Sequence, residues 1–226
     1  MGGAVGIVFS LFVKDLKMEF RSPRALLTTS FFALVTLVLF SFAFDPGIPE
    51  NASALPGVLW AALLFPGVIQ LNNSFRTEKE NDAFVAVLLT PVDRGTLFLG
   101  KCASNLTLLF LTGLLVLGCF VVVFNVSQGP EIFWIILLML PVDLAFASAG
   151  TILAGMVSGI SSREVLLPVI LFPVMVPVLV IAVNATGEIL LGNEGEVMFS
   201  WLKMAAASGL VFCGAGYLLF EHIVED

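Results

Sequence analysis

Six long apolar runs, separated by short polar segments, form the main pattern of this sequence. They cover residues 25–44, 55–74, 97–124, 132–157, 165–183 and 198–220. Each is close to or above the roughly 20 residues with which a helix, rising about 1.5 Å per residue, crosses about 30 Å of hydrocarbon. Strict period-2 alternation is absent, and lipid offers backbone groups no partners, so helices rather than barrel strands are predicted. We expect an all-α polytopic membrane protein with six transmembrane helices.

Residues 1–24 have a different, amphipathic pattern. A helix here would carry apolar side chains on one face and cations on the other; the apolar set is Val5, Val8, Phe9, Phe12, Leu16 and Phe20, and the cationic set is Lys14, Lys17 and Arg21. A basic amphipathic helix is typical of segments that lie in the plane of the membrane interface. Ser22–Pro23 then predicts an elbow into the first span. A frayed terminus is the alternative interpretation.

Composition favours a membrane protein and excludes a soluble one. Of the 226 residues, 59% are hydrophobic and 12% are charged, whereas about a quarter of the residues in soluble domains are charged. The mean hydropathy is +1.07. Because the 21 phenylalanines are spread along the whole length, the apolar character is not confined to one anchor. The chain, 1–226, is therefore interpreted as a single transmembrane domain.

Lysine and arginine are distributed asymmetrically between the two sets of connecting segments. Nine of the ten fall on the side that holds both termini: Lys14, Lys17, Arg21, Arg24, Arg76, Lys79, Arg94, Lys101 and Arg163. The loops of the other side (45–54, 125–131 and 184–197) contain none, and only Lys203 lies near them. Basic residues are enriched on the cytoplasmic side of a membrane. Both termini are therefore expected in the cytoplasm.

A charged segment lies between the second and third spans. Residues 76–101 carry eight charges: Arg76, Lys79, Arg94, Lys101, Glu78, Glu80, Asp82 and Asp93. Within it, Asp82–Leu89 has helical spacing, with acids in the first turn that suit the helix dipole and Pro91 to end the helix. Its apolar face would consist of Phe84, Val87 and Leu88. A short amphipathic helix can dock into a partner's groove, so the cytoplasmic loop 75–96 is predicted to bind a partner; the alternative is that its charges only set the topology.

Residues suited to catalysis or metal binding are scarce. Histidine occurs once, at His222, and Cys102, Cys119 and Cys213 are far apart in apolar runs, so neither an axial haem-ligand pair nor a CxxC motif is present. Residues 95–101 fit G-x-x-x-x-G-K, but a cysteine follows where a phosphate-binding loop needs Ser or Thr, and no strand precedes the segment. We expect no ATP hydrolysis by this chain, no cofactor or metal bound by it alone, and no nucleic-acid partner.

Asp143 is the only carboxylate well inside a predicted span, where a charge costs at least ~2.5 kcal/mol. We expect it to face the bundle interior, either as a functional group or as a protonated carboxyl bonded to Ser148, Thr151 or a neighbouring helix. The small residues between Ala145 and Gly159 predict close helix packing for this span. The next span is predicted to be kinked or broken, because proline removes a backbone donor; it contains Pro168, Pro173 and Pro177.

The stretch "LWAALLFPGVIQLNNSFRTEKENDAFVAVLLTPVDRGTLFLGKCASN" resembles type-2 ABC exporter permeases. Their pattern is a glutamate-rich segment, a helix ending in LL-x-x-P, and a GK pair that enters the next span; the matching residues are Glu78, Glu80, Leu88, Leu89, Pro91, Gly100 and Lys101. More narrowly, three collinear segments are similar to the CcmB family, the haem-exporter B subunits of cytochrome c maturation. They are "KDLKMEFRSPRALLTTSFFALVTLVLFSFAF", "LWAALLF" followed by "EKEN" and "LLTPVDR", and "SREVLLPVILFPVMVPVLVIAV".

This resemblance implies a permease subunit without enzymatic activity, which acts in haem delivery for cytochrome c maturation in the bacterial inner membrane. It implies two copies of the chain, a separate ABC ATPase subunit, a haem-handling membrane subunit, a small membrane subunit, and a periplasmic haem chaperone released on ATP hydrolysis. Haem would be a transported or handled ligand. The ATPase-coupling residues would be Arg76, Glu78, Glu80, Asp82, Phe84, Val87, Leu88, Pro91 and Arg94.

Three other functions can be compared with the sequence. A type-2 ABC permease for another substrate, such as a lipid, a drug or a polysaccharide, is the alternative within the same class. An intramembrane enzyme is disfavoured because Asp143 has no paired acid, His or Lys at membrane depth. A self-sufficient channel is disfavoured because rings of polar residues are absent.

Overall fold

The computed structural model describes residues 4–21, 24–44, 48–80, 93–126, 129–157, 163–193 and 195–223. These residues form helices and, within the described ranges, no β-strand. In chain order the elements are α1 (Ala4–Arg21), α2 (Arg24–Ala43), the short 3-10 helix η1 (Pro49–Ala54), α3 (Leu55–Glu80), α5 (Arg94–Val123), α6 (Pro130–Met156), α7 (Arg163–Leu190) and α8 (Glu196–Ile223).

Five of the described helices are long and apolar enough to cross a membrane; these stretches are Asn51–Ser74, Arg94–Val123, Pro130–Met156, Val165–Leu190 and Glu196–Phe220. The first predicted span corresponds to α2, whose apolar part is the shorter stretch Leu27–Ala43. At about 1.5 Å per residue, the 20 residues of α2 still reach about 30 Å. The all-helical, multi-pass class predicted from the sequence is confirmed.

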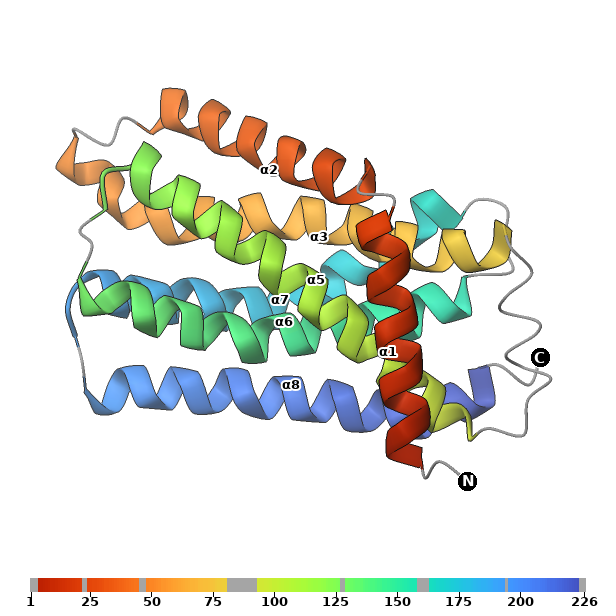
Figure 1. Ribbon diagram of the computed structural model, residues 1–226. Helices are drawn as coiled ribbons and strands as arrows, with labels where there is room; N and C mark the ends of the chain where they lie inside the picture. Colours follow the sequence, from red (N-terminus) through yellow and green to blue (C-terminus); the bar gives the residue numbers. More distant parts are fainter. Residues whose placement is uncertain are drawn as a thin grey trace.

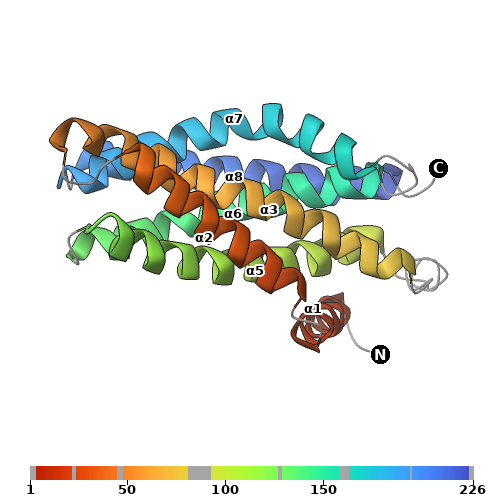
Figure 2. The ribbon, with the colours of Figure 1, turned by 90° about the horizontal axis from the view of Figure 1, so that it is seen from above.

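The long helices α2, α3 and α5–α8 run roughly side by side, and α1 crosses them near one end of the bundle (Figure 1). After a 90° turn, α1 is seen almost end-on beside the start of α2 (Figure 2). Its main contact is with α5. An amphipathic helix with a cationic face is stable in the interfacial plane, perpendicular to the spans. This crosswise position agrees with the interfacial helix predicted from residues 1–24.

The central helix of the bundle is α6. It contacts α3, α5, α7 and α8, and 56% of its most apolar stretch is buried, against 17% in α8. Small residues allow this packing: the side chain of Leu71 on α3 lies where a Cβ on Gly150 would stand. The close packing predicted for this span is confirmed. Fully buried large side chains around it include Phe98, Phe120, Leu59, Ile135, Leu138, Met139 and Met175.

Glycines set the distance between α8 and its neighbours. At Gly209, a Cβ would lie 2.8 Å from the backbone carbonyl oxygen of Pro141 on α6. At Gly216, a Cβ would meet the ring of Phe98 on α5. Because a residue without a side chain allows close backbone approach, these positions let α8 pack directly onto the centre of the bundle.

The path of α7 distinguishes between the two expected forms of this span, a kinked helix and a broken one. The helix runs from Arg163 to Leu190 without interruption, although it contains Pro168, Pro173 and Pro177. Its axis is visibly bowed in Figure 2. Neighbouring helices and local adjustments can compensate for the lost backbone donors in a membrane helix. The prolines therefore curve α7 rather than divide it, and the helix continues past Val183, where the span was predicted to end.

Candidate functional site: the charged end of the bundle and a buried polar seam

The predicted coupling residues 76–94 are connected to one end of the bundle. Helix α3 ends at Glu80, and α5 begins at Arg94 at the same end (Figure 1). The last turns of α3 therefore extend beyond Ser74 and carry the backbone of Arg76, Glu78 and Glu80. The remaining members of the predicted set lie outside the described residues; they are Asp82, Phe84, Val87, Leu88 and Pro91.

Asp93 is the N-cap residue of α5. Its carboxylate accepts hydrogen bonds from the backbone N–H and the hydroxyl of Thr96, each at 3.1 Å, and so satisfies a free donor of the first helical turn. The hydroxyl of Tyr217 on α8 donates to the same carboxylate at 3.5 Å. The ring of Tyr217 also lies against Gly95. The end of the coupling segment is thus attached to α8.

Lys101 joins three helices close to this end. Its side chain is buried, and the residue is 8% exposed. Its Nζ lies 3.4 Å from Oδ2 of Asp15 on α1 and donates to the carbonyl oxygen of Ser74 on α3 at 3.3 Å. Lys14 lies 3.2 Å from Oδ1 of Asp15. Because a buried charge is costly to leave unpaired, these contacts tie α1 and α3 to α5.

The sequence patterns that contain Gly100 and Lys101 did not predict these contacts. A Cβ at Gly100 would lie 2.9 Å from Cβ of Leu11, so the glycine lets α1 approach α5. Residues 95–101 lie inside α5 and form helix, not the loop after a strand that a phosphate-binding motif requires. The signal that could have indicated the ion pair is Asp15, an acid on the cationic face of the amphipathic segment.

Glu19 is a second acidic residue of α1 with an unusual environment. Its Oε1 is buried and has no hydrogen-bond partner within the described part of the chain. Burial raises the pKa of the Glu19 carboxyl above its ordinary value, because desolvation disfavours the charged form. The packing of α1 against the bundle is therefore sensitive to the protonation state of this group.

A seam of polar side chains lies between α5 and α6, deeper in the bundle. The Sγ of Cys102 lies 3.3 Å from Oγ of Ser148, and Nδ2 of Asn105 donates to Oγ1 of Thr151 at 3.0 Å. All four side chains are buried; we call them the polar seam. Ser148, Thr151 or a neighbouring helix were the partners expected for Asp143 if its role is structural. The structure pairs both hydroxyls with α5 instead.

A further buried pair connects α5 with α3. The hydroxyl of Thr112 donates to Oε1 of Gln70 at 3.4 Å. Nε2 of Gln70 and Oδ1 of Asn105 are buried without a hydrogen-bond partner among the described residues. Buried polar atoms in proteins nearly always bond to protein or to water. These two atoms therefore mark positions where water is expected.

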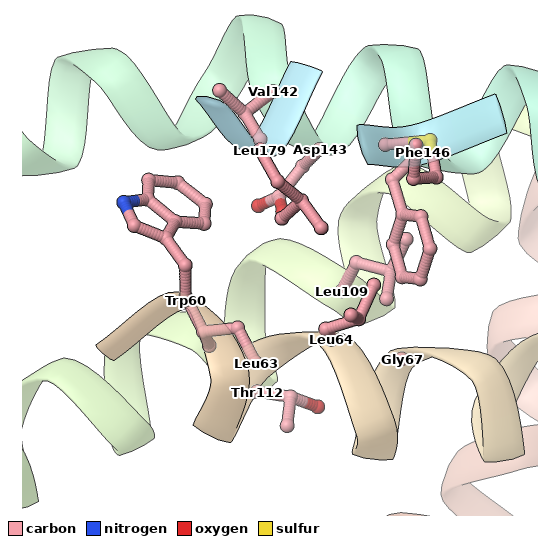
Figure 3. Close-up of a pocket in the computed structure, with 11 residues that line it drawn as sticks. Trp60, Leu63, Leu64, Gly67, Leu109, Thr112, Val142, Asp143, Phe146 and Leu179 are labelled. Atoms are coloured by element: carbon pink, nitrogen blue, oxygen red, sulfur yellow. The ribbon is translucent and has the colours of Figure 1, made fainter. Parts of the chain in front are cut away.

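Asp143 lies farther along α6, beside a cavity of about 20 Å³ between α3, α5, α6 and α7. Figure 3 shows its carboxyl group pointing from α6 into the space between Trp60 and Phe146. Leu109 and Thr112 of α5 also line this cavity. Asp143 is 6% exposed, and its Oδ2 has no hydrogen-bond partner within the described ranges. The volume is enough for about one water molecule.

The groups of the polar seam and of the cavity are hydrogen-bonding groups. Across the described residues, no three His, Cys, Asp or Glu side chains come together as metal ligands. The seam and the cavity bring together hydroxyls, amides, one thiol and one carboxyl. Such groups can bind water or a small polar group and can hold helices in register.

Comparison with known proteins relates most of the chain to one family. Heme exporter protein B of Pseudomonas aeruginosa is 25% identical over 206 residues, which cover 90% of this chain and 91% of that protein. The protein of the same name from Haemophilus influenzae is 24% identical over 178 residues, 78% of this chain and 79% of the relative. In Escherichia coli (strain K12) the match is 24% over 95 residues, 42% and 43% of the two chains. The family model described as CcmB protein matches residues 6–214, from α1 into α8. The chain therefore belongs to the CcmB protein family.

Proposed function

We propose that this protein is the membrane permease subunit of an ABC-type haem exporter that serves cytochrome c maturation. The observation that carries the proposal is the family match over residues 6–214. It is supported by relatives named heme exporter protein B that align along most of their length. A bundle of helices able to cross a membrane provides the architecture that a permease needs. The chain itself is proposed to have no enzymatic activity.

ATP hydrolysis would come from a separate ABC ATPase subunit that docks on the coupling residues 76–94. Helix α3 ends within this segment, at Glu80, and α5 begins at its last residue, Arg94. Asp93 contacts Tyr217 on α8, and Lys101 contacts α1 and α3. A displacement of the segment would therefore act on α1, α3, α5 and α8 through short polar contacts. This arrangement suits a part that receives motion from an ATPase.

The complex is proposed to contain two copies of this chain, a haem-handling membrane subunit, a small membrane subunit and a periplasmic haem chaperone. Haem is the handled substrate, and ATP hydrolysis releases the loaded chaperone. The protein would lie in the bacterial inner membrane with both termini in the cytoplasm. In support, the cationic helix α1, Arg94 and Lys101 lie at the same end of the bundle (Figure 1), as the positive-inside rule requires.

The test of this docking is co-purification of the ATPase subunit with variants of the permease. Phe84→Ala removes a proposed apolar anchor, whose burial is worth roughly 1.5–3 kcal/mol. Lys79→Ala removes a charge, and an exposed ion pair contributes about 0–1 kcal/mol. We expect Phe84→Ala to weaken co-purification more than Lys79→Ala, with membrane insertion intact in both. Equal retention in both, and in a variant that also has Val87→Ala and Leu88→Ala, would contradict docking at this segment.

A further inference from the structure

The cavity at Asp143 continues a line of polar groups that starts at the Lys101 end of the bundle. On α5 these groups are Lys101, Cys102, Asn105 and Thr112, which extend over about 16 Å at about 1.5 Å per residue. The polar seam covers the first part of the line, and the cavity covers the part between Leu109 and Thr112. The seam ends at Asn105 and the cavity begins at Leu109, about one helical turn farther along α5.

Three buried polar atoms on this line have no partner among the described residues. They are Oδ1 of Asn105, Nε2 of Gln70 and Oδ2 of Asp143. Each belongs to a different helix, and the line connects all three. Gly113 on α5 also lies near this carboxyl: a Cβ there would be 4.0 Å from Oδ2, but it would first meet the side chain of Met139. Water in the cavity is the partner that such atoms usually have.

The described surroundings of Asp143 contain no counter-ion. The other side chains that line its cavity come from α3, α5, α6 and α7, and none of them is titratable. Titratable side chains on the helices packed against α6 lie elsewhere; those that the structure describes at the side-chain level are Arg94, Lys101, Cys102 and Cys119 on α5, Glu188 on α7, and Glu196, Lys203, Cys213 and Tyr217 on α8. An unpaired carboxylate in such an apolar site is expensive, and a neutral acid avoids this cost.

We propose that Asp143 is a proton-binding site inside the bundle, which carries its proton in the described conformation and exchanges it with water along the polar seam. In each exchange the O–H bond of the carboxyl breaks and the proton passes to a water molecule. A proton from the same water chain returns to the carboxyl, so the net charge does not change. This inference goes beyond the transport role proposed above and does not depend on which substrate is handled.

Infrared spectroscopy of the full-length protein in lipid tests whether Asp143 carries a proton. The C=O stretching band of a protonated carboxyl is followed at neutral pH while H₂O is replaced by D₂O. We expect a band that shifts in D₂O and is absent from Asp143→Asn, a variant that keeps nearly the same shape and can still hydrogen-bond. A folded wild-type protein without an Asp143-dependent band would overturn the proposal, because Asp143 would then be ionised.

The rate at which this band shifts in D₂O tests whether the proton exchanges along the polar seam. Asn105→Leu removes an amide from the seam and should slow the exchange about tenfold, the effect of roughly 1.4 kcal/mol on a barrier. Thr186→Val is the matched control: Thr186 is equally buried and accepts a hydrogen bond from Nε1 of Trp60 at 2.9 Å, but it lies on α7 outside the seam. Thr151→Val is a second seam variant if Asn105→Leu does not fold. Exchange as fast in the seam variant as in Thr186→Val would overturn the seam as the route.

Discussion

A methyl group added at Gly209 is expected to push α6 and α8 apart. The new Cβ would lie 2.8 Å from the carbonyl oxygen of Pro141, and real Cβ atoms essentially never come within 3.0 Å of another heavy atom. The obstructing atom belongs to the backbone of α6. Two side-chain atoms of Leu144, Cδ2 and Cβ, lie 3.4 and 3.5 Å from the same Cβ. No rotamer change can therefore remove the clash with the backbone, and the helices themselves must move.

The size of the effect follows from two opposing terms. Overpacking a well-packed contact typically costs about 1–3 kcal/mol, while alanine favours a helix over glycine by about 0.8–1 kcal/mol. Gly214→Ala is a matched control on the same helix, because nothing lies within 4 Å of a Cβ at that position. The propensity term is common to both variants, so Gly209→Ala should be less stable than Gly214→Ala by about 1–3 kcal/mol.

The assay is the free energy of unfolding in mixed micelles, measured by circular dichroism during titration with a denaturing detergent. The loss of stability should appear only in Gly209→Ala, because only there does α8 meet a backbone atom of its neighbour. If Gly209→Ala and Gly214→Ala unfold at the same detergent fraction, the distance between α6 and α8 is not set by this glycine and the packing argument is wrong.

Two further predictions concern α1. Lys101→Met removes the contacts with Asp15 and Ser74 and should cost about 1–3 kcal/mol, seen as faster deuterium exchange in α1; exposed Lys203→Met is the control, and unchanged exchange would contradict the role of the ion pair. Glu19→Gln should flatten the pH dependence of the melting temperature. Burial raises the pKa of Glu19, so its stabilising contribution is complete below the ordinary pKa of glutamate and is lost as pH rises through the raised value. As pH rises above the ordinary pKa of glutamate, about 4, wild type should therefore lose more stability than the variant, and parallel curves would refute this assignment.

The helices of this protein could be predicted because the composition of each apolar run indicates that its residues lie in lipid. Lipid requires paired backbone groups and apolar side chains, and both requirements are local. The helix ends were harder to predict. Helix α3 continues to Glu80 and α7 to Leu190, since a helix does not have to end where lipid ends. Whether α7 is kinked or broken could not be decided from its own sequence, because the loss of a backbone donor is compensated by surroundings that the sequence of the segment does not contain.

The polar groups show more clearly which features the sequence determines and which ones only the tertiary structure decides. The sequence alone determined that Asp143 is a rare buried acid, that α1 is amphipathic and that the cations lie on one side. Tertiary structure decided which groups meet. Ser148 lies five residues after Asp143 on α6, about 140° around a helix with about 3.6 residues per turn, and therefore turns toward Cys102 on α5. Lys101 meets Asp15 across 86 residues of sequence, because hydrogen bonds and ion pairs act over a few ångströms in space, and only the packing of the helices brings such groups within that distance.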